Sequence, residues 1–298
     1  MTSSSASPSP PVGRPRTGHI QFLNCLPIYY GLVTGRGILD LDLVKGTPTE
    51  LNALLLEGAL DISPISSIEY ARHPGELMLL PGPTVSCLGA VQSILLISRC
   101  PIEKLDGKMV GLTDSSSTSH VLLRTLLERG HRVFPRYFSF GNDLPSALSR
   151  GDAALLIGDS ALRNLTPGEG LHVYDLGREW QRFSGQGMVF AVWAVRRAFA
   201  RAQPDLVTHA WRLFQDSITF CRDNLPAIAA DASRWERFPA GFLQEYFNSL
   251  SFDFTADLRR GLERFYLEAA ALGEIPSVPE IDFFTPTHEA LPQGSLLP

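Results

Sequence analysis

Short apolar runs alternate with segments of helical spacing along the first half of the chain. The runs are of strand length and lie at residues 18–25, 41–44, 61–63, 109–112, 137–140 and 152–157. One helix between them is well marked, because Thr47 and Glu50 form a capping box, Pro48 takes the first helical position and Gly58 is the expected end. Strands that alternate with helices predict parallel α/β sheets.

The same order of elements occurs twice. ALLLEGALDISPISS (residues 53–67) resembles ALSRGDAALLIGDSA (residues 147–161), and each gives a helix, a glycine stop, an aspartate, an apolar strand and a polar loop. Two such units predict two similar lobes. Apolar runs at 90–98 and 188–195 are long enough to cross between them, and helical spacing at 206–221 and 258–269 predicts helices that pack on the first lobe.

The predicted architecture is a two-lobe α/β protein with two interlobe crossovers and a central cleft. Residues 17–95 and 192–298 form lobe 1, residues 96–191 form lobe 2, and the Ser/Pro-rich residues 1–16 form a disordered tail. This tail lacks the apolar stretch of a signal peptide, and no apolar run reaches the roughly 18 residues of a membrane span. The expected compartment is therefore the cytoplasm.

Composition and motifs argue against several function classes. The net charge of −5 does not favour a nucleic-acid partner. The four cysteines contain no CxxC pair and the seven histidines no HxH or HExxH pattern, so we expect reduced thiols and no metal site. Because GxGxxG, GxxxxGK[ST] and GxSxG are also absent from the sequence, no cofactor is expected.

Polar residues follow the predicted strands at the edge where parallel α/β sheets bind ligands. Asn24 ends the first strand, and the hydroxyl-rich loop 113–119 runs into a helix whose N-terminus favours a carboxylate or phosphate. Structural roles compete with ligand binding, since Asn24 suits a turn and Asp159 suits a helix cap. The candidate ligand-binding residues are Gln21, Asn24, Ser66, Ser93, Thr118, Ser119 and Asp159.

Five segments in order along the chain carry a family resemblance. They are GHIQFLNCLPIYYGL, PISSIEY, GAVQSILLIS, LTDSSSTSHVLLRTLL and LLIGDSAL, of which FLNCLP is the most specific. From about residue 17 to about residue 275 the chain thus resembles the chorismate dehydratase family of menaquinone biosynthesis. The resemblance implies a type II periplasmic-binding-protein fold. It also implies a lyase that converts chorismate to 3-enolpyruvylbenzoate and water, without metal or organic cofactor, at the start of the futalosine route.

The resemblance also assigns residues. The family's first-strand asparagine falls on Asn24, its crossover serine on Ser93, and its Thr-Ser pair at a helix start on Thr118 and Ser119, whereas Gln21 stands where many relatives carry a serine. We predict that Asn24 is catalytic and that Gln21, Ser66, Ser93, Thr118, Ser119 and Asp159 bind the substrate. The expected partner is a small dicarboxylate, with no nucleic acid or membrane, and the chain is expected to be a monomer or weak homodimer.

Two alternatives stay open at this point. One is the sister enzyme that makes 1,4-dihydroxy-6-naphthoate, against which FLNCLP and GDSAL argue. The other is a non-catalytic small-anion binding protein, either exported or regulatory. An exported one would carry a signal peptide or lipobox, and a regulatory one a DNA-binding helix-turn-helix.

Overall fold

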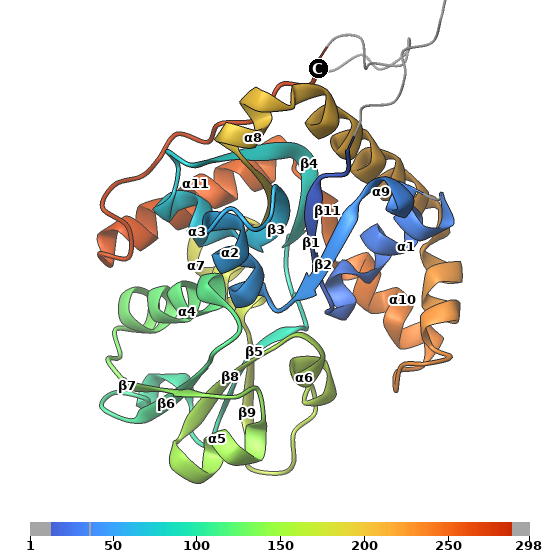
Figure 1. Ribbon diagram of the computed structural model, residues 1–298. Helices are drawn as coiled ribbons and strands as arrows, with labels where there is room; N and C mark the ends of the chain where they lie inside the picture. Colours follow the sequence, from blue (N-terminus) through green and yellow to red (C-terminus); the bar gives the residue numbers. More distant parts are fainter. Residues whose placement is uncertain (1–12, 36, 288–298) are drawn as a thin grey trace, which may run out of the picture.

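Two sheets form the framework of the computed structural model, which describes residues 13–35 and 37–287 (Figure 1). Much of the predicted tail, residues 1–12, and the last residues of predicted lobe 1, 288–298, lie outside this description. The first lobe holds β1 (Arg16–Ile20), β2 (Asp42–Gly46), β3 (Ile62–Ser66), β4 (Leu77–Cys87), β10 (Met188–Arg196) and β11 (Ser251–Asp253). The second lobe holds β5 (Ile94–Ser98), β6 (Met109–Thr113), β7 (Arg136–Phe140), β8 (Ala153–Ile157) and β9 (His172–Asp175).

Helices cover both sheets. Those of the first lobe are α1 (Leu26–Thr34), α2 (Pro48–Leu56), α3 (Ser67–Arg72), α8 (Arg197–Ala202), α9 (Pro204–Ala232), α10 (Ala240–Ser249) and α11 (Ala256–Ala271). Those of the second lobe are α4 (Ser117–Arg124), α5 (Leu144–Arg150), α6 (Gly158–Arg163) and α7 (Leu176–Ser184). Short turns complete the set: the 3-10 helices η1 (Leu23–Cys25), η2 (Gly37–Asp40) and η3 (Ile102–Lys104), and the π-helical η4 (Thr125–His131) that continues α4.

Both sheets are mixed rather than parallel throughout. Their strand orders are β11-β4-β10-β3-β1-β2 and β7-β6-β8-β5-β9. The predicted parallel pairing is confirmed for β1 with β2 and β3, and for β6 with β7 and β8. It is wrong for β10, which runs antiparallel to β3 and β4, and for β5, which runs antiparallel to β8 and β9. These strands follow or precede an interlobe crossing, so no covering helix returns the chain to a parallel direction.

The crossings are shorter than the apolar runs that predicted them. Residues 88–93 join β4 to β5, and residues 185–187 join α7 to β10. All of β5 lies in the sheet of the second lobe and all of β10 in that of the first. The proposed limits at 95/96 and 191/192 therefore fall inside these two strands, and the division into lobes at those residues stays a prediction.

Local signals placed several elements correctly. The Thr47 Oγ1 accepts a hydrogen bond from the Glu50 amide at 3.3 Å, while the Thr47 amide donates to Glu50 Oε2 at 2.8 Å, so the capping box is confirmed. The first strand, however, ends at Ile20 and not at residue 25. Residues 23–25 form η1, in which the Cys25 amide donates to the Phe22 carbonyl at 3.0 Å, and α1 follows at once with Pro27 in its first turn.

The long C-terminal helices pack on the first lobe, as predicted. Helix α9 contacts α1, α10 and β4, and α11 contacts β10. Helix α11 also reaches α3 and, across the lobe boundary, α4. One buried hydrophobic cluster runs through both lobes, and a smaller one packs α5 and α6 on the second sheet. The four cysteines are free thiols, as expected. Within the described ranges, no helix is long and apolar enough to cross a membrane.

We expect Gly261→Ala to destabilise the fold. Gly261 lies in α11 where the helix approaches residue 187, and a Cβ there would overlap the Gly187 carbonyl oxygen. Alanine favours a helix by about 1 kcal/mol over glycine, but overpacking against backbone costs about 1–3 kcal/mol or more. Urea unfolding should show a lower midpoint than wild type. Gly241→Ala in α10 is the control, because nothing lies within 4 Å of a Cβ there, and an equal midpoint for the two variants would contradict the prediction.

Candidate active site

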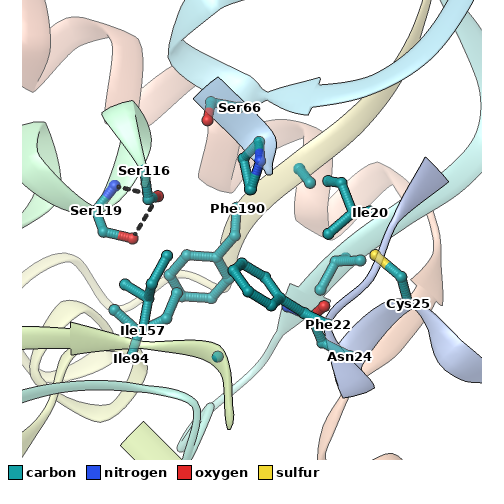
Figure 2. A pocket seen from close by; sticks show the side chains of 14 residues that line it. Ile20, Phe22, Asn24, Cys25, Ser66, Ile94, Ser116, Ser119, Ile157 and Phe190 are labelled. Carbon is teal, nitrogen blue, oxygen red and sulfur yellow. Dashed lines mark hydrogen bonds between the residues drawn. The ribbon is translucent and has the colours of Figure 1, made fainter. Parts of the chain in front are cut away.

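A small cavity lies between the lobes at the carboxyl ends of β1, β3 and β8 (Figure 2). It measures about 40 Å³, room for only a few water molecules. The lining residues are Ile20, Phe22, Asn24, Cys25, Pro48, Ser66, Val85, Phe190 and Ala191 from the first lobe and Ile94, Ser116, Ser119, Ile157 and Gly158 from the second. Both lobes therefore contribute walls, and the strand-end rule selected the correct edge of each sheet.

Asn24 lies in η1 and faces this cavity. Its Oδ1 atom is buried and has no hydrogen-bond partner among the residues that the structure describes. Buried amide oxygens are nearly always satisfied in folded proteins, so an unsatisfied one in a cavity wall suits a ligand that donates a hydrogen bond. A residue serving only a turn would instead bond to nearby backbone.

Ser116 and Ser119 form the polar corner of the cavity on the second lobe. Ser116 is the N-cap of α4, where its Oγ accepts from the Ser119 amide at 3.4 Å and lies 2.9 Å from the Ser119 Oγ (Figure 2). The first amides of a helix have no intrahelical acceptor, and its dipole favours negative charge there. This corner can therefore hold a carboxylate with hydroxyl and amide donors.

Thr118 does not line the cavity, which differs from the expectation for a residue that binds substrate. Its Oγ1 accepts from the Ile68 amide at 3.2 Å and lies 3.3 Å from the Ser67 Oγ, so it joins α4 to α3 of the other lobe. The physical reason is helix geometry. Ser116 and Ser119 are three positions apart and share a face, whereas Thr118 is rotated from Ser119 by about 100°.

The other predicted residues divide in the same way. Ser66 lines the cavity, and its backbone amide donates to Asn52 Oδ1 at 3.2 Å. Ser93 is fully buried outside the lining, and its Oγ donates to the Val91 carbonyl at 3.3 Å. Gln21 follows β1 instead of lying within it, is exposed, and lines a separate surface pocket. Its predicted place inside a strand is wrong, because the chain leaves the sheet at Ile20.

Asp159 also lies outside the lining. Its Oδ1 accepts a hydrogen bond from the Leu23 amide at 3.2 Å, across the lobe boundary. Burial raises the pKa of this carboxyl, although the Leu23 hydrogen bond and the charge of Arg163 oppose the shift. The expectation that it caps the helix following β8 is not met, because α6 has no side-chain cap hydrogen bond.

Two aromatic walls of the cavity are not among the residues predicted from the sequence. Phe22 lies just before η1, and Phe190 lies in β10, yet their side chains point into the same cavity beside Ile157 (Figure 2). In the sequence each is one more apolar residue in an apolar run. They become neighbours only in the folded sheet, where β3 alone separates β10 from β1.

None of the lining residues that the structure describes has an acidic or basic side chain. The Cys25 thiol does, but burial raises its pKa well above the ordinary value, so it stays protonated. His120, which follows Ser119 in α4, lies outside the lining with its Nε2 close to the Thr113 carbonyl oxygen, and burial lowers its pKa. Over residues 13–35 and 37–287, no group of three His, Cys, Asp or Glu side chains could hold a metal ion.

Comparisons with known proteins identify relatives of this chain. A family model described as menaquinone biosynthesis matches residues 15–271. The chorismate dehydratase of Thermus thermophilus is 36% identical over an alignment of 191 residues, and the match covers 58% of this chain and 69% of that protein.

Solved structures share the fold at low identity. An Archaeoglobus fulgidus protein superposes with a TM-score of 0.71 at 19% identity, over 88% of this chain and 98% of that one. A Candida albicans protein described as having the generic periplasmic-binding-protein fold gives a TM-score of 0.62 at 12% identity, over 93% and 99%. The aliphatic sulphonate binding protein of Escherichia coli gives 0.61 at 15%, over 95% of each chain. The two-lobe periplasmic-binding-protein-like fold expected from the sequence is thereby confirmed.

Proposed function

The chain belongs to the menaquinone-biosynthesis family, and on that premise we propose that it is a chorismate dehydratase whose interlobe cavity converts chorismate to 3-enolpyruvylbenzoate and water. The reaction would open the futalosine route. The observation that carries the assignment to this cavity is the buried amide oxygen of Asn24, for which the described part of the chain offers no hydrogen-bond partner. The substrate brings a C4 hydroxyl that can donate to such an acceptor.

Substrate recognition relies on neutral groups. Chorismate has two carboxylates, and the hydroxyls of Ser116 and Ser119 with the first amides of α4 offer donors to one of them. Phe22 and Phe190 supply apolar surface for the ring. Because the cavity has only about 40 Å³ in this closed arrangement, the lobes must part to admit the substrate and close again around it.

The chemical step is an elimination that makes the ring aromatic. The C3–H bond breaks, its electron pair enters the ring, and the C4–O bond breaks so that hydroxide leaves and takes up the proton as water. The Asn24 NH2 group can donate to the departing oxygen, and α4 can stabilise the negative charge that develops toward the ring carboxylate. Since none of the described residues that line the cavity is charged, the base in this proposal is the substrate's own enolpyruvyl carboxylate, which takes the C3 proton and passes it to the leaving hydroxide.

Incubation with chorismate tests this function. An aromatic product that is lighter than chorismate by one water should appear in absorbance and mass spectra. Binding of chorismate without turnover would favour the binding-protein alternative. If chorismate is neither bound nor consumed, the proposal is refuted. Turnover of the nucleoside-derived precursor of 1,4-dihydroxy-6-naphthoate, but not of chorismate, would identify the sister enzyme.

We expect turnover without added metal or nucleotide. The reaction as proposed transfers no electrons to a cofactor, and the described lining residues offer hydroxyl, amide, protonated thiol and apolar groups. Dialysis against EDTA should leave kcat and KM for chorismate unchanged. Loss of activity after EDTA treatment would contradict this expectation if a divalent metal then restores the activity. Dialysis against the same buffer without EDTA is the control and should leave the activity unchanged.

A further inference from the structure

The contacts between the two lobes differ between the α4 side and the α6 side of the boundary. On the α4 side, Arg124 pairs with Glu274 and Arg129 pairs with the buried Glu268 of α11. Thr118 adds its hydrogen bond from Ile68. Charge-assisted hydrogen bonds are stronger than hydrogen bonds between neutral groups. We therefore expect the α4 side of the second lobe to stay in contact with the first lobe when the lobes part.

On the α6 side the contact is small and lies at the cavity wall. The Leu23 amide donates to Asp159 Oδ1 at 3.2 Å, and the ring of Phe22 lies so close to Gly158 that a Cβ there would be 3.1 Å from it. Gly158 has φ +58°, a conformation that glycine adopts without strain. Because Phe22 and Gly158 both line the cavity, parting the lobes here opens it and breaks the Asp159 contact.

The contact acts on the turn that carries Asn24. Leu23 is the first residue of η1, and the preceding residue, Phe22, makes no side-chain cap hydrogen bond. The first amides of any helical turn need an acceptor from outside it. Asp159 provides that acceptor from the opposite lobe, one residue before Asn24.

We propose that Asp159 is a positioning residue: when the lobes close over the substrate, its carboxylate caps the turn Leu23–Cys25 and so sets the Asn24 amide toward the reacting hydroxyl. This inference rests on the proposed function and replaces the expectation that Asp159 binds the substrate. A carboxylate turned toward a dianionic substrate would repel it. A carboxylate directed at the Leu23 amide instead forms its hydrogen bond when the lobes close, so that closure itself positions Asn24.

Kinetics of Asp159→Ala and Asp159→Asn test the role. Asp159→Ala should lower kcat about 10- to 100-fold and change KM by less than about threefold. The variant loses the hydrogen bond from the Leu23 amide to a charged carboxylate, and with it the positioning of Asn24. Asp159→Asn keeps an oxygen acceptor and should restore most of kcat. In a background of Asn24→Ala, removing Asp159 should lower kcat no further, because the residue that it positions is already gone.

A measurement independent of activity accompanies the kinetics. Hydrogen exchange at the Leu23 amide should accelerate about tenfold in Asp159→Ala. Asp143→Ala is the matched control, because Asp143 caps α5 of the same lobe by accepting from the Ser146 amide at 3.0 Å. It should accelerate exchange at Ser146 and leave both Leu23 exchange and kcat unchanged.

The outcomes separate this inference from the proposed function. If the wild-type protein does not turn over chorismate, the proposed function fails, and Leu23 exchange still reports whether Asp159 caps the turn. If the wild type is active, either of two results overturns the positioning role: unchanged kcat and Leu23 exchange in Asp159→Ala, or a KM raised tenfold at constant kcat. The second result would make Asp159 a substrate ligand.

Discussion

Asn24→Ala should lose about 10²–10³-fold in kcat for chorismate and keep the wild-type fold. The Asn24 Oδ1 is buried in the cavity wall without a partner, so its removal breaks no hydrogen bond of that oxygen within the described chain. The loss falls on kcat because the donor to the departing hydroxyl is used most as charge develops. Asn24→Asp should be worse, since a carboxylate repels a dianion and no described lining residue has a basic side chain to offset the repulsion.

The thermal midpoint and kcat, measured on the same preparation, distinguish catalysis from folding. A turn residue would give a lower midpoint with near-normal turnover, and that result for Asn24→Ala would refute the catalytic role. Asn248→Ala provides a matched control, because Asn248 is exposed on α10 away from the cavity. It should keep both kcat and the midpoint.

Removing both cavity hydroxyls of α4 should reduce kcat/KM about 10- to 150-fold. Ser116 and Ser119 line the cavity at the N-terminus of α4, and a hydrogen bond to a charged group contributes about 1.5–3 kcal/mol. Ser116→Ala with Ser119→Ala should act mainly through KM, because a carboxylate is bound in both the ground state and the transition state. Steady-state kinetics with chorismate measure this.

Thr118→Val separates binding from lobe attachment in the same helix turn. It leaves the buried Ile68 amide without its acceptor, which costs about 1–3 kcal/mol of stability, while the cavity wall is unchanged. We expect a lower thermal midpoint and a KM close to wild type. Ser149→Ala, on the exposed face of α5, serves as the control for loss of a hydroxyl. A large rise in KM for Thr118→Val at unchanged stability would instead support the original expectation that Thr118 binds the substrate.

Local rules determined much of this protein. The capping box at Thr47 and Glu50 formed as predicted, as did the strands near 109–112 and 152–157. Each of these patterns lies within a few positions of the chain, so it can be recognised before the distant strands with which β6 and β8 pair are known. Asn24, Ser66 and Ser119 were also predicted correctly to line one cavity. Each lies at or after the carboxyl end of a strand, where parallel α/β sheets bind ligands.

Only the tertiary structure decided which of the predicted residues line the cavity and which connect the lobes. Thr118 and Ser119 are adjacent in the sequence, yet one joins the lobes and the other faces the cavity, because the packing of α4 against α3 sets the rotation of the helix. The meeting of Phe22 with Phe190, and of Leu23 with Asp159, joins segments more than a hundred residues apart. Such contacts depend on the order of strands in a sheet and on the closure of two lobes, and neither leaves a periodic or compositional signal in the chain.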